Sequence, residues 1–208
     1  MNRRNFIKRG LVGGALGLFM GRVLAARPTP AEIEGPFYPV LAQKDKDFDL
    51  THIQGQPGAA RGRVIVIHGR ILDTEGRPVE DVTVDLWQAN AAGRYRHLHD
   101  ANKAPLDANF QGWAIVPSGK DGRFRFKTIY PGSYPASDTW VRPPHIHFKV
   151  SKRGYVELVT QMYFPDEKLN ERDILLHRKT PDERRLMIAA RVGNDADIYE
   201  YDVVLQRA

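Results

Sequence analysis

One short stretch of the chain has residue types and spacing that could hold a metal ion: Arg142-Pro143-Pro144-His145-Ile146-His147-Phe148. Alternate side chains of an extended strand leave by the same face, so His145 and His147 would point together. Neutral imidazole is a common metal ligand, and this pair would supply half of a four-ligand site. Any half-buried strand shows the same alternation, so the pair alone also fits a strand with histidines on its solvent side.

Two tyrosines in turn-like segments could complete the ligand set. Tyr95 follows Gly93 and Arg94, and Tyr134 sits in the bend 131–135, which would present its ring from a rigid loop. A loop tyrosine by itself is usually an amphipathic anchor. Two phenolates with two imidazoles form a hard, anionic set that favours a trivalent ion, and the ion would lower the pKa of both tyrosines. The four residues together predict a metal centre.

Other assignments of the histidines stay open. His97 and His99 form a second pair with the same spacing and compete as ligands, although loop histidines are more often solvated. A cupin-like ferrous enzyme would use a histidine pair with a glutamate a few residues later, whereas the first acidic residue after His147 is Glu157. A non-enzymatic transthyretin-like or immunoglobulin-like binding module would need neither the tyrosines nor Arg142.

Residues 1–26 have the pattern of an export signal. They hold five basic and no acidic residues, an apolar run from Leu11 to Met20, and a small-residue end at Ala25 and Ala26. The segment Arg3-Arg4-Asn5-Phe6-Ile7-Lys8 resembles the twin-arginine pattern, with Asn2 where Ser or Thr is usual. Export to the periplasm or outside the cell is therefore expected, with an uncleaved anchor helix as the alternative. The twin-arginine route suits proteins that acquire a cofactor before export.

Charge and composition narrow the classes of function. The 31 basic and 25 acidic residues give a net charge of +6, and removing residues 1–26 leaves 26 against 25. A net charge of +1 for the mature chain does not indicate nucleic-acid binding, and we expect no membrane contact once the signal is removed. Cysteine is absent, which excludes disulfides, thiolate metal sites and cysteine nucleophiles. Any metal must bind His, Tyr, Asp or Glu.

The remaining chain divides into an arm, residues 27–61, and a β domain, residues 62–208. The arm is rich in Pro and Gly, and Phe37 and Tyr38 are its expected anchors. Short runs of β-forming residues separated by Gly, Pro and Asp turns predict an all-β sandwich. A capping box from Thr180 to Glu183 predicts one helix that includes Leu186, Met187 and Ala190. The expected strands are 63–72, 82–88, 123–128, 145–150, 157–164 and 199–205.

A series of motifs in order resembles one enzyme family, the intradiol ring-cleavage dioxygenases. The similarity covers most of residues 62–206. It implies an antiparallel or mixed β-sandwich, a catecholic substrate, O2 and a ferric ion, with no organic cofactor. The motifs are Glu34 to Tyr38, Leu86 to Asn90, Gly93 to His97, Asn109-Phe110, Asp121-Gly122 to Thr128, Pro131 to Tyr134, Arg142 to Phe148 and Thr160 to Phe164.

The resemblance also implies a role for individual residues. Tyr134 would be both a ligand and the acceptor of a catechol proton, Arg142 would stabilise charge that develops on the ring, and Gln161 would assist it. The product would be a cis,cis-muconate-type diacid. Gly35 and Pro36 would bind substrate, and Leu175 or Ile174 would line the pocket. The implied ligands of the non-haem Fe(III) are Tyr95, Tyr134, His145 and His147.

Some positions differ from the family pattern and leave the substrate open. Tyr134 and His145 are only eleven residues apart, and Ala136 stands where an aromatic residue is expected after the ligand tyrosine. Too few residues precede Arg63 to build the helical dimerisation segment of the catechol and hydroxyquinol branches. A homo-oligomer is still possible through residues 27–61, which could provide a subunit contact.

Overall fold

A computed structural model describes residues 26–41, 43, 45–193 and 197–208. The predicted export signal, residues 1–26, lies outside the described residues except for Ala26. No helix within the described ranges is long and apolar enough to cross a membrane. The elements are β1 Val64–Asp73, β2 Thr83–Trp87, β3 Trp113–Pro117, β4 Arg123–Ile129, β5 Tyr134–Ser137, β6 Trp140–Arg142, β7 His145–Ser151, β8 Leu158–Tyr163, the 3-10 helix Lys168–Arg172, α1 Ile174–His177, α2 Pro181–Met187, β9 Ala190–Arg191, β10 Ile198–Glu200 and β11 Val203–Leu205.

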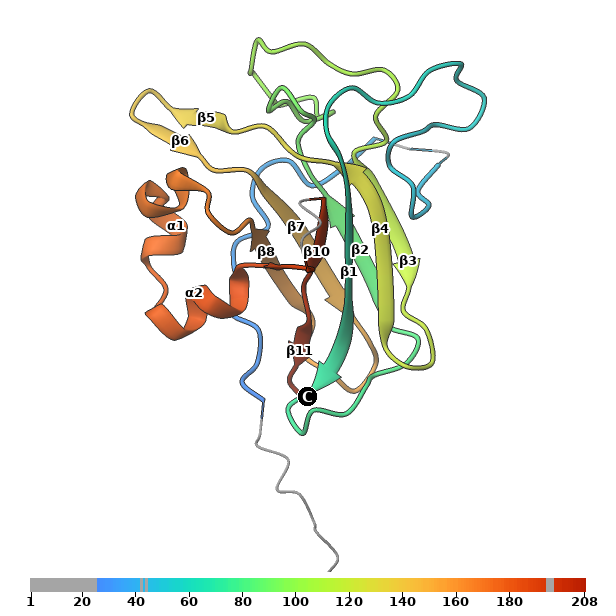
Figure 1. Ribbon diagram of the computed structural model, residues 1–208, viewed down its shortest axis with the longest axis vertical. Helices are drawn as coiled ribbons and strands as arrows, with labels where there is room; N and C mark the ends of the chain where they lie inside the picture. Colours follow the sequence, from blue (N-terminus) through green and yellow to red (C-terminus); the bar gives the residue numbers. More distant parts are fainter. Residues whose placement is uncertain (1–25, 42, 44, 194–196) are drawn as a thin grey trace, which may run out of the picture.

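Two sheets face each other and form the predicted sandwich (Figure 1). The first has the order β11-β1-β10-β9 with β4 on β1, and β1 pairs in parallel with β10 and β11 and antiparallel with β4. The second is antiparallel, with the order β3-β2-β7-β8. A separate hairpin, β5–β6, extends from one end, and α1 and α2 lie on the side of β8 (Figure 1).

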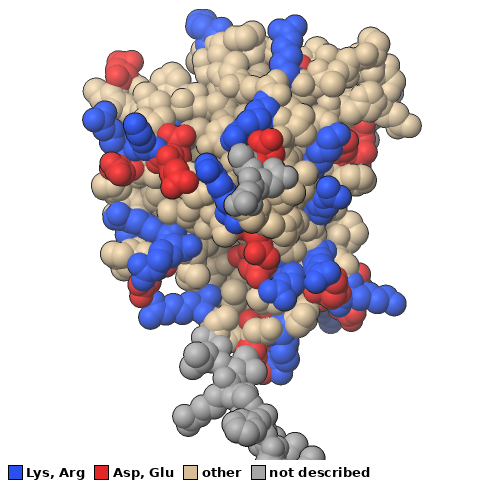
Figure 2. Space-filling view, viewed as in Figure 1, with Lys and Arg blue, Asp and Glu red and all other residues tan. Residues whose placement is uncertain are grey.

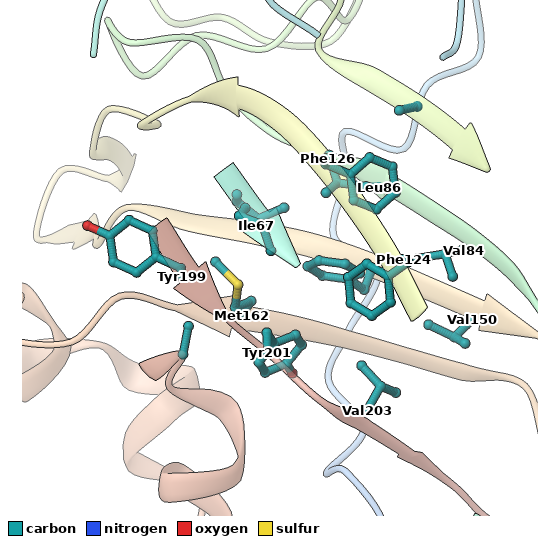
Figure 3. Packing of buried hydrophobic residues seen from close by; sticks show 14 of the residues in the cluster. Ile67, Val84, Leu86, Phe124, Phe126, Val150, Met162, Tyr199, Tyr201 and Val203 are labelled. Carbon is teal, nitrogen blue, oxygen red and sulfur yellow. The ribbon is translucent and has the colours of Figure 1, made fainter. Parts of the chain in front are cut away.

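The core fills the space between the two sheets. Alternate residues of each strand point into it, as the period of two requires. Phe126 of β4 lies near Leu86 of β2, and Ile67 of β1, Met162 of β8 and Tyr199 of β10 are buried in the same core (Figure 3). Ile146 and Phe148 of β7 are fully buried in this core, so His145 and His147 leave by the opposite face of the second sheet.

The arm covers that opposite face. Between residues 26 and 61 the described backbone forms isolated bridges but no helix or strand. The backbone N–H of Glu32 donates to the carbonyl of Val159 at 2.8 Å, which ties the arm to β8. Phe37 and Tyr38 are its anchors, as expected: Phe37 packs on Tyr95 with ring centroids 4.8 Å apart, and the Tyr38 hydroxyl donates to Asp85 at 2.7 Å. The arm therefore buries the histidine face of β7.

Several predicted elements differ in detail. The expected strand 199–205 is two strands, because the Asp202 carboxylate accepts the N–H of Arg70 at 2.8 Å in place of a ladder bond. The predicted capping box of α2 is present, but the helix ends at Met187 and Ala190 belongs to β9. The prediction of one helix missed α1 and the 3-10 turn, and β3, β5, β6 and β9 were also missed.

Charged side chains of both signs are interspersed on the face of the molecule shown in Figure 2. Ion pairs link strands and turns among the described residues. Arg70 pairs with Asp202 at 3.2 Å, and Asp73 accepts from Arg77 at 2.9 Å. The Arg70–Asp202 pair is partly exposed on both sides, and such pairs contribute little individually to stability, whereas the Asp73 carboxylate is buried.

Candidate active site

The strand register aligns the histidines of β7 with polar residues of the neighbouring strands. His147 lies between Trp87 of β2 and Gln161 of β8, and His145 pairs with Tyr163 of β8. Both histidines are buried, with ring centroids 4.9 Å apart. The expectation that they share one face is confirmed. Ile146 and Phe148 point into the core, so the face of β7 that carries the two histidines points away from it.

Tyr95 reaches the histidines from a turn. Its hydroxyl lies 3.1 Å from Nε2 of His147 and 3.5 Å from Nε2 of His145. The side chain of Asn90 accepts the backbone N–H of Arg94 at 3.0 Å, and the carboxylate of Asp100 accepts that of Tyr95 at 2.7 Å. These bonds fix the backbone on both sides of the turn, so the phenol is held in place by the loop itself.

Tyr134 enters from the hairpin rather than from an irregular loop. It is the first residue of β5 and pairs directly with Arg142 of β6. Its ring meets Tyr95 edge-on at 5.5 Å and lies 5.6 Å from His145. Gly93, with φ of +78°, passes so close to the Ser133 carbonyl that a Cβ could not be accommodated. This contact brings the Tyr95 turn against the Tyr134 hairpin.

Burial sets the protonation of the histidines. Burial, then the charge of Arg142, lowers the pKa of His147 to about 3, and the same two causes followed by His147 hold that of His145 well below its ordinary value. Nδ1–H of His145 donates to the Pro143 carbonyl at 2.7 Å, which leaves its Nε2 lone pair facing Tyr95. The flat face of Trp87 stacks on His147 at 4.8 Å. Both rings are thus neutral and oriented.

The four side chains fit a hard metal ion. Two imidazole nitrogens and two phenol oxygens converge within a buried site, and that donor set suits a trivalent cation. Burial, with Tyr134 as the next cause, raises the pKa of Tyr95 well above its ordinary value, and burial also raises that of Tyr134. A cation in the site would reverse this direction and convert the phenols to phenolates.

The cupin-like alternative finds no support in the geometry. Within the described part of the chain, no group of three or more His, Asp, Glu or Cys side chains gathers as a metal site would require. His97 and His99 lie close to each other, with ring centroids 5.4 Å apart, and no bond between either of them and the histidines of β7 is present among the described residues. His99 is exposed at the rim of the neighbouring cavity, as a solvated loop histidine is.

Arg142 lies in a buried hydrogen-bond network, of which the sequence predicted only Gln161. Its Nε donates to the Asp173 carboxylate at 2.7 Å, and its Nη2 donates to Gln161 at 2.6 Å and to the Tyr163 hydroxyl at 3.1 Å. The side chains of Arg142 and Asp173 are only 5% and 0% exposed. Gln161 therefore lies beside Arg142, as expected. Asp173 and Tyr163 were missed.

Each missed residue had a weak local signal. Asp173 precedes the short apolar helix α1, and its side chain accepts the N–H of Leu176 at 2.9 Å as an N-cap. Tyr163 stands two residues after Gln161, so it shares the same face of β8. Neither pattern indicates that the residue contacts Arg142, which comes from the packing of α1 against the end of β8.

A cavity of about 390 Å³ opens beside the ligand cluster. Gly35 and Pro36 line it, as predicted, together with Tyr134, Arg142 and His147. A Cβ at Gly35 would lie 3.5 Å from Cε1 of His147, so the arm runs directly over that ring. Gln161 donates to the Ile33 carbonyl at 3.0 Å and fixes the arm there.

Ile174 and Leu175 were expected to line the pocket, but neither belongs to the wall of this cavity. Leu175 is a buried residue of α1, whereas Ile174 is 45% exposed.

Comparison with known proteins decides the family. A family model described as Dioxygenase matches residues 33–207. The protocatechuate 3,4-dioxygenase beta chain of Burkholderia cepacia is 39% identical over 192 residues, which cover 86% of this chain and 81% of that protein. The chain belongs to the intradiol ring-cleavage dioxygenases. It is thus an oxidoreductase of the dioxygenase class, in a family that acts on catechols.

Other members of the family are more distant or longer. Catechol 1,2-dioxygenase 1 of Acinetobacter lwoffii is 33% identical, and the match covers 68% of this chain but about half, 48%, of that protein. Among solved structures, the dioxygenase domain of a carbohydrate-binding fusion protein from Streptomyces sp. SirexAA-E has a TM-score of 0.64 at 28% identity, covering 88% of this chain and 100% of that one. The 3-chlorocatechol 1,2-dioxygenase of Rhodococcus opacus 1CP, at 22% identity and a TM-score of 0.69, covers 89% and 75% and supports the fold alone.

Proposed function

We propose that this dioxygenase binds Fe(III) and cleaves the ring of a catecholic substrate between its two hydroxyl-bearing carbons. The ligands would be Tyr95, Tyr134, His145 and His147. Both atoms of O2 enter the product, a cis,cis-muconate-type diacid, so no external reductant is needed. The observation that carries the proposal is the convergence of the Tyr95 hydroxyl on Nε2 of both histidines, at 3.1 and 3.5 Å.

A ferric ion held by these four residues would supply Lewis acidity that favours ionisation of the catechol hydroxyls. The chain's own residues bind and orient the substrate. Tyr134 lines the cavity and lies opposite Arg142 in the hairpin, so it is placed to accept a proton from a catechol hydroxyl. Arg142 also lines the cavity and offers a fixed positive charge to the ring oxygens.

Gln161 and the arm complete the substrate site. Gln161 is fully buried. Its side chain accepts a hydrogen bond from Arg142 and donates one to the Ile33 carbonyl of the arm. Gly35 and Pro36 form the wall that the arm contributes, and the absence of a side chain at Gly35 leaves room over the His147 ring.

Isotope labelling tests the proposal. Iron-replete protein should consume one O2 per catechol, and the diacid made under 18O2 should carry label in both new carboxyl groups. A matched variant, Gln161→Ala, should retain iron but turn over more slowly, because Arg142 loses one of its acceptors. A product with an aldehyde group, formed by cleavage beside the hydroxyl-bearing carbons, would contradict the proposal, as would no oxygen uptake with any catechol.

A further inference from the structure

The wall of the 390 Å³ cavity is mainly apolar and is wider than a bare catechol ring requires. An engineered apolar cavity of about 150 Å³ already accepts benzene. The arm, the hairpin and the loop that includes Asp100 all contribute to the wall of the present cavity. Its apolar lining includes Ile33, Pro36, Phe37, Pro135, Ala136 and Trp140.

The positive charge that Arg142 brings to this cavity is shared with other partners. Arg142 is the single Lys or Arg among the described lining residues, and its guanidinium is bound to the fully buried carboxylate of Asp173. Asp100 adds a second carboxylate to the wall, where it accepts backbone N–H groups from Tyr95 at 2.7 Å and Asn102 at 2.9 Å. Neither bond brings a compensating charge to Asp100.

A carboxylate on the substrate ring would therefore enter a poor environment. It would lose its hydration shell against apolar side chains and meet the charge of Asp100, and the described lining residues include no Lys or Arg other than Arg142 to pair with it. Position 136 also offers no partner for a carboxylate. Ala136 stands on the hairpin wall, is exposed and carries no polar group that could bind a substituent.

We infer that the substrate of this enzyme is a catechol with an apolar, uncharged ring substituent, and that ring carboxylates are disfavoured. The inference rests on the proposed function, since it concerns the same site. It separates this chain from its relative in Burkholderia cepacia, whose name gives a carboxylated catechol as substrate.

Two catechols with side chains of similar size test the inference: 4-propylcatechol and 3,4-dihydroxyphenylacetate. Anaerobic calorimetry should give an affinity for the propyl compound about tenfold or more above that for the acetate, and kcat/KM should follow the same order. Equal or tighter binding of the acetate would overturn the inference. Binding in the expected order without turnover of any compound would instead contradict the proposed function and leave the substrate preference standing.

A pair of variants at the hairpin wall checks that charge is the cause. Ala136→Lys adds a cation where the wall is open, and Ala136→Gln adds similar bulk without charge. The lysine variant should bind 3,4-dihydroxyphenylacetate several-fold better relative to 4-propylcatechol, whereas the glutamine variant should keep the original ratio. If both variants shift the ratio equally, shape rather than charge sets the preference and the inference is wrong.

Discussion

Replacement of Asp173 by alanine should cost more stability than removal of any exposed carboxylate. The Asp173 side chain is fully buried and bonds to Nε of Arg142 at 2.7 Å. Without it, the guanidinium stays buried with only the neutral acceptors Gln161 and Tyr163. Breaking a buried pair by removal of one partner costs about 3–5 kcal/mol. Loss of the N-cap to Leu176 adds about 1 kcal/mol.

Denaturant unfolding measures this cost as a lower midpoint at an unchanged slope. Asp173→Asn provides a milder second variant, because it retains the cap and one acceptor while it removes the charge, so its loss should be smaller. The control is Asp182→Ala, which breaks an exposed pair with Arg27 and should cost less than about 1 kcal/mol. A loss below about 1 kcal/mol in Asp173→Ala would refute the view that this carboxylate anchors Arg142.

Two further variants test the turns that support the site. Gly93→Ala should destabilise the protein by more than about 1 kcal/mol and reduce activity, since its Cβ would collide with the Ser133 carbonyl, while Gly154→Ala, with similar φ but open space, should cost less and leave activity intact. Between pH 7 and pH 2 the wild type should lose more unfolding free energy than Asp73→Asn does. Burial alone would raise the pKa of Asp73, but hydrogen bonds from Arg77 hold it below its ordinary value. That contribution is present above the unfolded pKa of about 3.9 and is lost as the pH falls through the folded one, so stability curves from pH 7 to pH 2 measure it; parallel curves would contradict the assignment.

The metal-ligand candidates were accessible to sequence reasoning because their signals are local. The period of two in β7 assigns His145 and His147 to one face whatever the strand packs against. Turn residues before Tyr95 and Tyr134 place both rings outside the regular core. The capping box of α2 is local in the same sense, and it is present from Thr180 to Glu183 as predicted.

The support of Arg142 could not be predicted, because it depends on contacts between distant segments. Asp173 follows Arg142 by 31 residues and reaches it only because α1 packs at the end of β8. The break between β10 and β11 is similar: it depends on the meeting of Asp202 with the backbone of Arg70, 132 residues away. The periodicity of one segment carries no information about contacts between residues that are far apart in the sequence.

The visible spectrum of iron-replete protein tests the proposed metal centre most directly. The account predicts one iron per chain and a broad tyrosinate-to-iron band that shifts when a catechol is added without oxygen. Tyr95→Phe should weaken or move that band, whereas Tyr155→Phe, which removes a tyrosine hydroxyl from a side chain packed on Arg207, should not. A colourless protein that binds no iron after reconstitution, or a band unchanged by Tyr95→Phe, would contradict it.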